Sequence, residues 1–165
     1  MEVKIRPARP GDGEGIARAH LDSGRTYSDL DPSTFHVPQK DGLAEWTESF
    51  LREGPPPGHH WTVAVAEGSV VGYAEAHVEE PRDDAHRQIQ NEFFDRRVSL
   101  DALAVAEAWR RHGIGTRLVR EVEAWAREQG AARVFLDTWA ESPMSVPFYK
   151  SLGYRARAIN FDKRL

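Results

Sequence analysis

A short segment rich in arginine and glycine could bind phosphate. Its residues are Arg110, Arg111, His112, Gly113, Ile114, Gly115 and Thr116. The apolar run before it predicts a strand, and the periodic apolar residues after it predict a helix. Glycine leaves backbone N–H groups uncovered, and the N-terminus of a helix carries partial positive charge that attracts anions. The segment therefore favours a ligand with a diphosphate group.

The glycine spacing alone is shared by many ordinary helix starts. A dinucleotide-binding fingerprint needs a third glycine, but that position is Leu118. A P-loop needs Gly-Lys-Ser or Gly-Lys-Thr, and neither tripeptide occurs in the chain. The two neighbouring arginines favour phosphate binding, with a plain helix start as the alternative.

Composition limits the classes of protein that the chain could represent. Its 165 residues suffice for one domain with a core, and 40% of them are hydrophobic. The net charge of −4 argues against a nucleic-acid partner. The absence of cysteine excludes disulfides, thiolate metal sites and a cysteine nucleophile, and the seven histidines show no metal-site spacing, so no metal is expected. Without a signal peptide or an apolar stretch of about 20 residues, we expect a cytoplasmic protein with no membrane partner.

The pattern along the chain predicts strands and helices in one domain. Strands are expected at 2–6, 61–66, 70–78, 98–105, 132–139 and 154–163, and helices at 12–30, 43–52, 116–129 and 146–151. Residues 81–97 are predicted as a mobile loop, or a short helix near 91–94. The turn at 67–69 indicates a hairpin, whereas the strand–helix–strand unit across 98–139 needs a parallel crossover. The expected fold class is α/β (α+β), with a mixed, mostly antiparallel sheet of six to seven strands and helices on both faces.

Two motifs together resemble those of the GNAT-type N-acetyltransferase superfamily. Arg110-x-x-Gly113-x-Gly115, after an apolar strand, is similar to its acetyl-CoA motif. Residues 147–154, Pro-Phe-Tyr-Lys-Ser-Leu-Gly-Tyr, are similar to its second motif. The predicted element order matches the family over essentially the whole chain. The resemblance implies a GNAT-like acyl-CoA N-acyltransferase fold, a single N-acetyltransferase domain over residues 1–165, and a cofactor-binding core at roughly 98–154.

The resemblance also implies which residues of the first motif hold acetyl-CoA. Backbone groups of Leu103, Ala104 and Val105 would pair with the pantetheine arm, next to a bulge that splays two neighbouring strands. Backbone N–H groups of residues 111–116 would hold the pyrophosphate, with charged support from Arg110 and Arg111.

The second motif supplies the remaining cofactor contacts under the same resemblance. Phe148 and Tyr149 form its aromatic pair, and Tyr149 would lie by the sulfur and protonate the leaving thiolate. The alternative for Tyr149 is a core aromatic beside Phe148. Ser142 and Ser145 stand where many family members carry Asn and Ala, and Ser142 can still donate a hydrogen bond to the cofactor.

Acetyl transfer to an amine also needs a group that accepts a proton. Ser99 and Asp101 share one face of their strand, and several family members place their base at one of these two positions. Asp101 is therefore the first candidate, and Glu75 on the preceding strand the second. Two close carboxylates would raise the pKa of one and would attract a cationic amine. The alternative for both is a solvated or paired surface carboxylate.

The absence of cysteine and of a Gly-x-Ser-x-Gly elbow leaves direct attack of the amine on the thioester in a ternary complex. The expected acceptor is a primary amine on a small molecule or a peptide terminus. Transfer from a longer acyl-CoA, or to a hydroxyl, is one alternative. A non-catalytic domain that binds or senses acetyl-CoA or CoA is another. Several family members dimerise, so a homodimer is expected.

Overall fold

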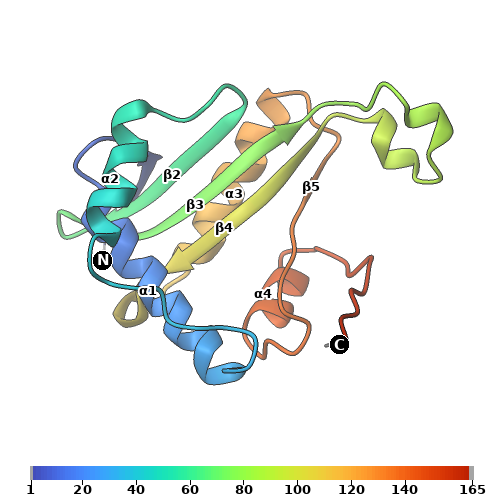
Figure 1. Ribbon diagram of the computed structural model, residues 1–165. Coiled ribbons are helices and arrows are strands. Elements are labelled where there is room, and N and C mark those ends of the chain that lie inside the picture. Colours follow the sequence, from blue (N-terminus) through green and yellow to red (C-terminus); the bar gives the residue numbers. More distant parts are fainter. Residues whose placement is uncertain (1, 164–165) are drawn as a thin grey trace.

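The computed structural model describes residues 2–163 and shows one sheet between two layers of helices. Within these residues the sheet has five strands, which lie in sequence order from β1 to β5 (Figure 1). Helices α1 and α2 lie on one side of the sheet and α3 on the other. The strands are β1 (Val3–Pro7), β2 (His59–Ala66), β3 (Ser69–Glu79), β4 (Arg97–Val105) and β5 (Arg133–Phe135). The helices are α1 (Gly13–Leu30), α2 (Leu43–Glu53), α3 (Ile114–Glu128) and α4 (Ser145–Ser151).

These bounds confirm the predicted α/β class and the helices on both faces, but the predicted strand count is wrong. The strand expected over 132–139 is reduced to β5, and residues 154–163 form no strand. Alternating polar and apolar residues form a strand only where a neighbouring strand pairs with the backbone and an apolar surface packs against one face. Here the side chains of the last segment face solvent, with Ile159 76% and Phe161 90% exposed.

The antiparallel part of the sheet is built from hairpins. Strands β2 and β3 are joined by a two-residue turn in which Glu67 has φ 51° and Gly68 has φ 77°. Positive φ at both central positions is the geometry that matches the twist of paired strands. Strand β4 pairs antiparallel with β3, and the crossover through α3 makes β5 parallel to β4.

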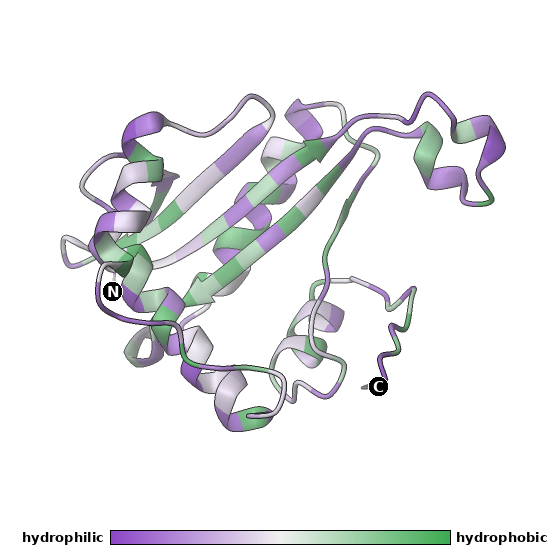
Figure 2. Ribbon diagram, viewed as in Figure 1, coloured by the Kyte–Doolittle hydropathy of each residue, from purple (hydrophilic) through white to green (hydrophobic). Residues whose placement is uncertain are grey.

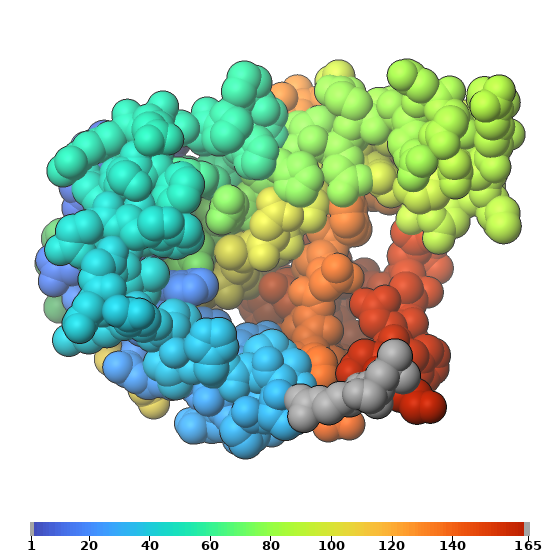
Figure 3. Space-filling view, viewed as in Figure 1, coloured from blue at the N-terminus to red at the C-terminus, as the bar shows by residue number. Residues whose placement is uncertain are grey.

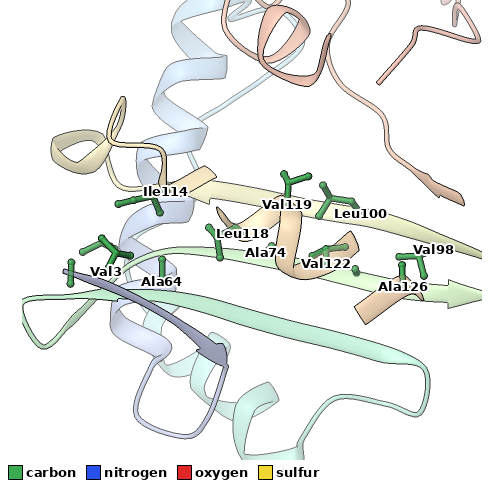
Figure 4. Close-up of a cluster of buried hydrophobic side chains, with 13 residues drawn as sticks. Val3, Ala64, Ala74, Val98, Leu100, Ile114, Leu118, Val119, Val122 and Ala126 are labelled. Carbon is green, nitrogen blue, oxygen red and sulfur yellow. The ribbon is translucent and has the colours of Figure 1, made fainter. Parts of the chain in front are cut away.

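The main hydrophobic core lies between α3 and the sheet. Figure 2 shows apolar and polar residues alternating along β3 and β4, so that each strand has one apolar face. Figure 4 shows the helix side chains against small strand residues, which let α3 approach the sheet closely. The buried members of this cluster include Ala64, Ala74, Val98, Leu100, Leu118, Val119 and Val122.

Two irregularities in β4 open the sheet. Among residues 2–163, β5 accompanies β4 only from Arg97 to Ser99, so the outer edge of β4 beyond Ser99 has no strand beside it. On the other edge, Glu75 pairs with Ala102 and Ala76 pairs with Leu100, which leaves Asp101 as the extra residue of a β-bulge. The bulge between β3 and β4 therefore lies next to the point where β4 and β5 part.

The segment between β3 and β4 extends away from the end of the sheet (Figure 1). It contains two short 3-10 helices, η1 (Ala85–Arg87) and η2 (Asn91–Phe94), and the second confirms the short helix predicted near 91–94. Ion pairs join it to the sheet, from Arg133 to Asp95 at 3.0 Å and from Arg97 to Glu92 at 3.7 Å. No helix within residues 2–163 combines the length and apolar character needed to cross a bilayer.

Candidate functional site

The N-terminus of α3 presents free backbone donors beside β4. Gly113 precedes the helix in a left-handed conformation with φ 75°, and the first intrahelical bond runs from the Arg117 N–H to the Gly113 carbonyl at 3.1 Å. The N–H groups of Ile114, Gly115 and Thr116 therefore have no partner within the helix. Arg111 and His112 in the same turn are exposed. This arrangement can receive a phosphate group.

The Arg110 side chain, which was expected beside the pyrophosphate, makes hydrogen bonds within the protein. Its Nε donates to the Val105 carbonyl at 3.1 Å, its Nη1 to Thr26 Oγ1 at 2.9 Å and its Nη2 to the Asp22 carbonyl at 3.0 Å. The guanidinium thus ties the end of β4 to α1 and also occupies one backbone acceptor of the proposed pantetheine edge. Of the two arginines, Arg111 is the one left exposed in this turn.

Helix α4 brings the second motif to the start of α3. A Cβ atom added at Gly115 would lie 3.3 Å from Cζ of Phe148, so the two motifs meet at this glycine. The Tyr149 ring lies 5.0 Å from that of Phe148 and 5.8 Å from that of Tyr154, and it packs against the core. Burial, with a smaller effect from Tyr27, raises the pKa of the Tyr149 phenol. The hydroxyl therefore keeps its proton at physiological pH.

The two serines before and within α4 are engaged inside the protein. Ser142 is 4% exposed, and its hydroxyl accepts the Ser145 N–H at 3.0 Å, which stabilises the start of the helix. The Ser145 hydroxyl lies 2.9 Å from the Tyr27 hydroxyl on α1. The Ser142 oxygen thus serves as an internal acceptor, and the hydrogen bond expected from Ser142 to the cofactor stays a prediction. Ser142 stabilises the start of α4, and Ser145 joins α4 to α1.

A row of polar side chains lies on the face of β3 that α1 covers. It consists of Tyr73, Glu75 and His77, at alternate positions of the strand. The Tyr73 hydroxyl lies 2.9 Å from Nδ1 of His20 on α1. Burial raises the pKa of Tyr73 and lowers that of His20, while the charge of Glu75 acts on both groups to raise the pKa. Glu75 thus supplies negative charge to an otherwise neutral part of the face.

Asp101 is held by two neighbours at the bulge. His77 Nδ1 lies 2.6 Å from Asp101 Oδ2, and the Ser99 hydroxyl donates to Asp101 Oδ1 at 2.7 Å. Glu75 pairs with Ala102, next to Asp101 along β4, but the side chain that contacts Asp101 is His77. Sequence reasoning missed His77. The alternation along β3 from Glu75 could have found it, because it places position 77 on the same face.

Aromatic side chains join α1 to the segment that follows β5. The Phe35 ring lies 5.1 Å from both Tyr27 and Trp139. Figure 3 shows a hollow bounded by α1 (blue), β4 (yellow) and the orange residues after β5. Asp101 stands at one end of the splayed part of β4, and Val105 at its other end lies close to Gly115 at the start of α3. Such a region can hold a phosphate-bearing ligand on one side and a cationic group on the other.

Within the described part of the chain, no group of three or more His, Cys, Asp or Glu side chains could hold a metal ion. The site is thus built from backbone donors, carboxylates, imidazoles and phenols.

Known proteins resemble this chain in sequence and in fold. Residues 24–154 match the Acetyltransferase (GNAT) family. The chain belongs to this family. It is 33% identical over 119 residues to N-acetyltransferase 8 of Homo sapiens, a match that covers 72% of this chain and 47% of that protein. It is also 25% identical over 169 residues to streptothricin acetyltransferase of Streptomyces lavendulae, covering 92% of this chain and 80% of that protein.

The chain therefore spans about half the length of its human GNAT relative and most of the length of the bacterial one. Among solved structures, it resembles a mutant of the BH1408 protein from Bacillus halodurans. The TM-score is 0.83 at 20% identity, with 98% of this chain and 99% of that chain covered. This likeness shows that the fold is shared over nearly the whole chain, and the family match identifies it as the GNAT fold.

Proposed function

We propose that this GNAT chain transfers the acetyl group of acetyl-CoA directly to a primary amine of a small molecule or peptide terminus. The observation that carries the proposal is the parting of β4 and β5 beyond Ser99, with the free N–H groups of α3 at one side and the carboxylates at the other. The streptothricin acetyltransferase of Streptomyces lavendulae is named for a small-molecule substrate, which supports an acceptor of this kind.

The cofactor side of the proposal rests on backbone groups. The donors of Ile114, Gly115 and Thr116 would bind the pyrophosphate, with Arg111 and His112 around it. The edge of β4 at Leu103, Ala104 and Val105, apart from the Val105 carbonyl that Arg110 binds, would pair with the pantetheine arm as a further strand would. Gly115 supports this fit, because Phe148 lies so close beside it that an added Cβ would make a tight contact at 3.3 Å.

The chemistry of the proposal needs an uncharged amine and a stabilised oxyanion. The carboxylates of Glu75 and Asp101 would attract the cationic acceptor. The Val105 N–H would donate to the oxyanion that develops on the thioester carbonyl. The protonated hydroxyl of Tyr149 would donate a proton to the departing thiolate. With the reactants held in one ternary complex, most of the rate gain would come from positioning.

The first experiment is calorimetric titration with acetyl-CoA and CoA, with ATP and NADH as controls. We expect binding of both CoA species alone. A thiol-release assay then tests primary amines, including streptothricin, an aminoglycoside, spermidine and short peptides. We expect release that depends on the amine. Absence of CoA binding would contradict the proposal.

A matched pair of glycine variants tests the phosphate-binding turn. Gly113 (φ 75°) and Gly130 (φ 70°) lie at opposite ends of α3, and an added Cβ meets nothing within 4 Å at either position. Gly113→Asp and Gly130→Asp therefore add the same charge with the same backbone strain. We expect Gly113→Asp to weaken acetyl-CoA binding at least about 100-fold by repelling the diphosphate, and Gly130→Asp to leave it near wild type. Equal affinities would place the diphosphate elsewhere.

The alternatives give different results in the same assays. A sensing domain would bind acetyl-CoA and release no thiol with any amine. A transferase for longer acyl groups would show a higher kcat/KM with a longer acyl-CoA than with acetyl-CoA. Gel filtration or light scattering across a concentration series tests the expected homodimer.

A further inference from the structure

We propose that His77, rather than Asp101, accepts the proton of the acceptor amine, and that Asp101 and Ser99 position the imidazole. This inference rests on the proposed function. It assigns a catalytic role to His77, which takes no part in the proposed phosphate binding or in the proposed protonation of the thiolate.

The hydrogen bonds around Asp101 leave it poorly suited to act as the base itself. One carboxylate oxygen faces His77 Nδ1 at 2.6 Å and the other accepts from Ser99 at 2.7 Å. Each oxygen therefore already has one hydrogen-bond partner, and hydrogen bonds to the ionised carboxylate weaken it as a base. A carboxylate at Nδ1 favours the tautomer with a proton on that nitrogen, which leaves Nε2 with a free lone pair.

The other charged and titratable groups around His77 come from β2 and β3. The His59 ring on β2 stacks on it at 5.3 Å with an interplanar angle of 22°. Glu79 lies 4.0 Å from Nε2, beyond hydrogen-bond distance, and pairs with Arg97. Glu75 is the next residue along the same face of β3. The side chains of His77 and Asp101 are 32% and 31% exposed, so an acceptor can reach the imidazole.

Acetyl transfer from the thioester to the amine balances in protons and electrons without a further reactant. His77 Nε2 takes one proton from the ammonium group and later releases it to solvent, while the Asp101 carboxylate stabilises the imidazolium. The amine nitrogen forms a bond to the thioester carbon, and the carbon–sulfur bond breaks with its electron pair on sulfur. The second proton of the attacking nitrogen reaches the thiolate through Tyr149. The products are the amide, CoA thiol and one proton.

The kinetic test compares His77→Gln with His86→Gln. His86 is an exposed histidine of η1, outside the site. We expect His77→Gln to lower kcat about 10²–10³-fold, with unchanged acetyl-CoA affinity, and to remove the acidic limb of the pH–rate profile. Asp101→Asn is expected to lower kcat less than His77→Gln does, and to shift the acidic limb of the profile along the pH axis. His86→Gln should behave as wild type.

An NMR measurement tests the same inference without an acceptor. Long-range ¹H–¹⁵N spectra of ¹⁵N-histidine-labelled protein, assigned with His77→Gln, report which ring nitrogen carries the proton. We expect the Nδ1–H tautomer in the wild type and a shift toward Nε2–H in Asp101→Asn. The control is ¹⁵N-histidine-labelled Thr34→Ala, which removes an exposed hydroxyl 43 positions before His77 in the sequence.

The outcomes separate the inference from the proposed function. Amine-dependent thiol release with an unchanged rate and pH profile in His77→Gln would overturn the inference and leave the transferase standing. An Nε2–H tautomer in the wild type would also overturn it. Failure of every amine to promote thiol release would overturn the proposed function, and the inference with it.

Discussion

The two faces of the sheet differ in what their residues do. On the α3 face, the strand residues are small and apolar and are buried against the helix, as Ala74 and Ala76 of β3 show. On the α1 face, the intervening positions of the same strand carry Tyr73, Glu75 and His77, which remain partly exposed. One strand thus contributes to the core through every second residue and to the candidate site through the others.

This difference indicates that stability and chemistry can be altered separately. Burial of apolar surface dominates the folding free energy. The larger buried cluster lies on the α3 face, and a smaller one packs α1 and α2 against β2 and β3. In the polar row, Tyr73 packs against buried residues on the α1 side, whereas the side chains of Glu75 and His77 are only partly buried. Substitutions on the two faces should therefore separate a loss of fold from a loss of activity.

The largest effect is expected from Leu118→Ala on the α3 face. Leu118 is 0% exposed, and its loss leaves a cavity between α3 and the sheet. We expect the free energy of unfolding to fall by about 3–5 kcal/mol in denaturant titration. Leu43→Ala, at the half-buried start of α2, is the control with the same change of side chain and should cost less. A cost below about 1 kcal/mol at Leu118 would contradict the assignment of the core.

A smaller and different effect is expected from Glu75→Gln on the α1 face. The carboxylate lies in the polar row, and its removal weakens the attraction for a cationic amine. We expect KM for the amine to rise about 10-fold and the stability to change by less than about 0.5 kcal/mol. Glu45→Gln, at an exposed position of α2, should leave both unchanged. A large stability loss in Glu75→Gln would show that the two faces are not separable.

The smallest effect concerns a titratable group on the apolar face. His60 of β2 stacks on Trp125 of α3 at 4.8 Å, and burial lowers its pKa, against the opposing charges of Glu121 and Glu128. Because the unfolded chain then binds a proton more readily, His60 costs stability as the pH falls below about 6.5. We expect stability to fall less between pH 7 and 5 in His60→Gln than in the wild type, by at most about 1.4 kcal/mol per pH unit. An identical slope in both proteins would show that His60 does not titrate with folding, and His86→Gln serves as the control.

Much of the fold could be predicted because its signals are local. The helical period from Leu118 to Ala126, the Glu67-Gly68 turn and the β-rich runs on either side of it each depend on a few neighbouring residues. The predicted helices and the first four strands agree with the structure to within about two residues. The segment 154–163 failed because alternation specifies a strand only when a partner is present.

The candidate site was predictable in part for the same reason. The glycine turn before α3 and the Phe148-Tyr149 pair are local motifs, and the structure brings them together at Gly115. Arg110 could not be assigned from sequence, since its three acceptors lie on α1 and at the end of β4. His77 was missed because its contact with Asp101 depends on the register of β3 against β4 and on the bulge.

The sequence by itself determined the helices, the first four strands, their order and the mixed sheet, because backbone preference and hydrophobic period act over a few residues. Only the tertiary structure decided where β4 and β5 part, which of the two arginines before α3 stays exposed and which side chain meets Asp101. Those features depend on strand register and on contacts between residues distant in the chain. No local pattern encodes them, since a shift of one residue in register exchanges the two faces of a strand.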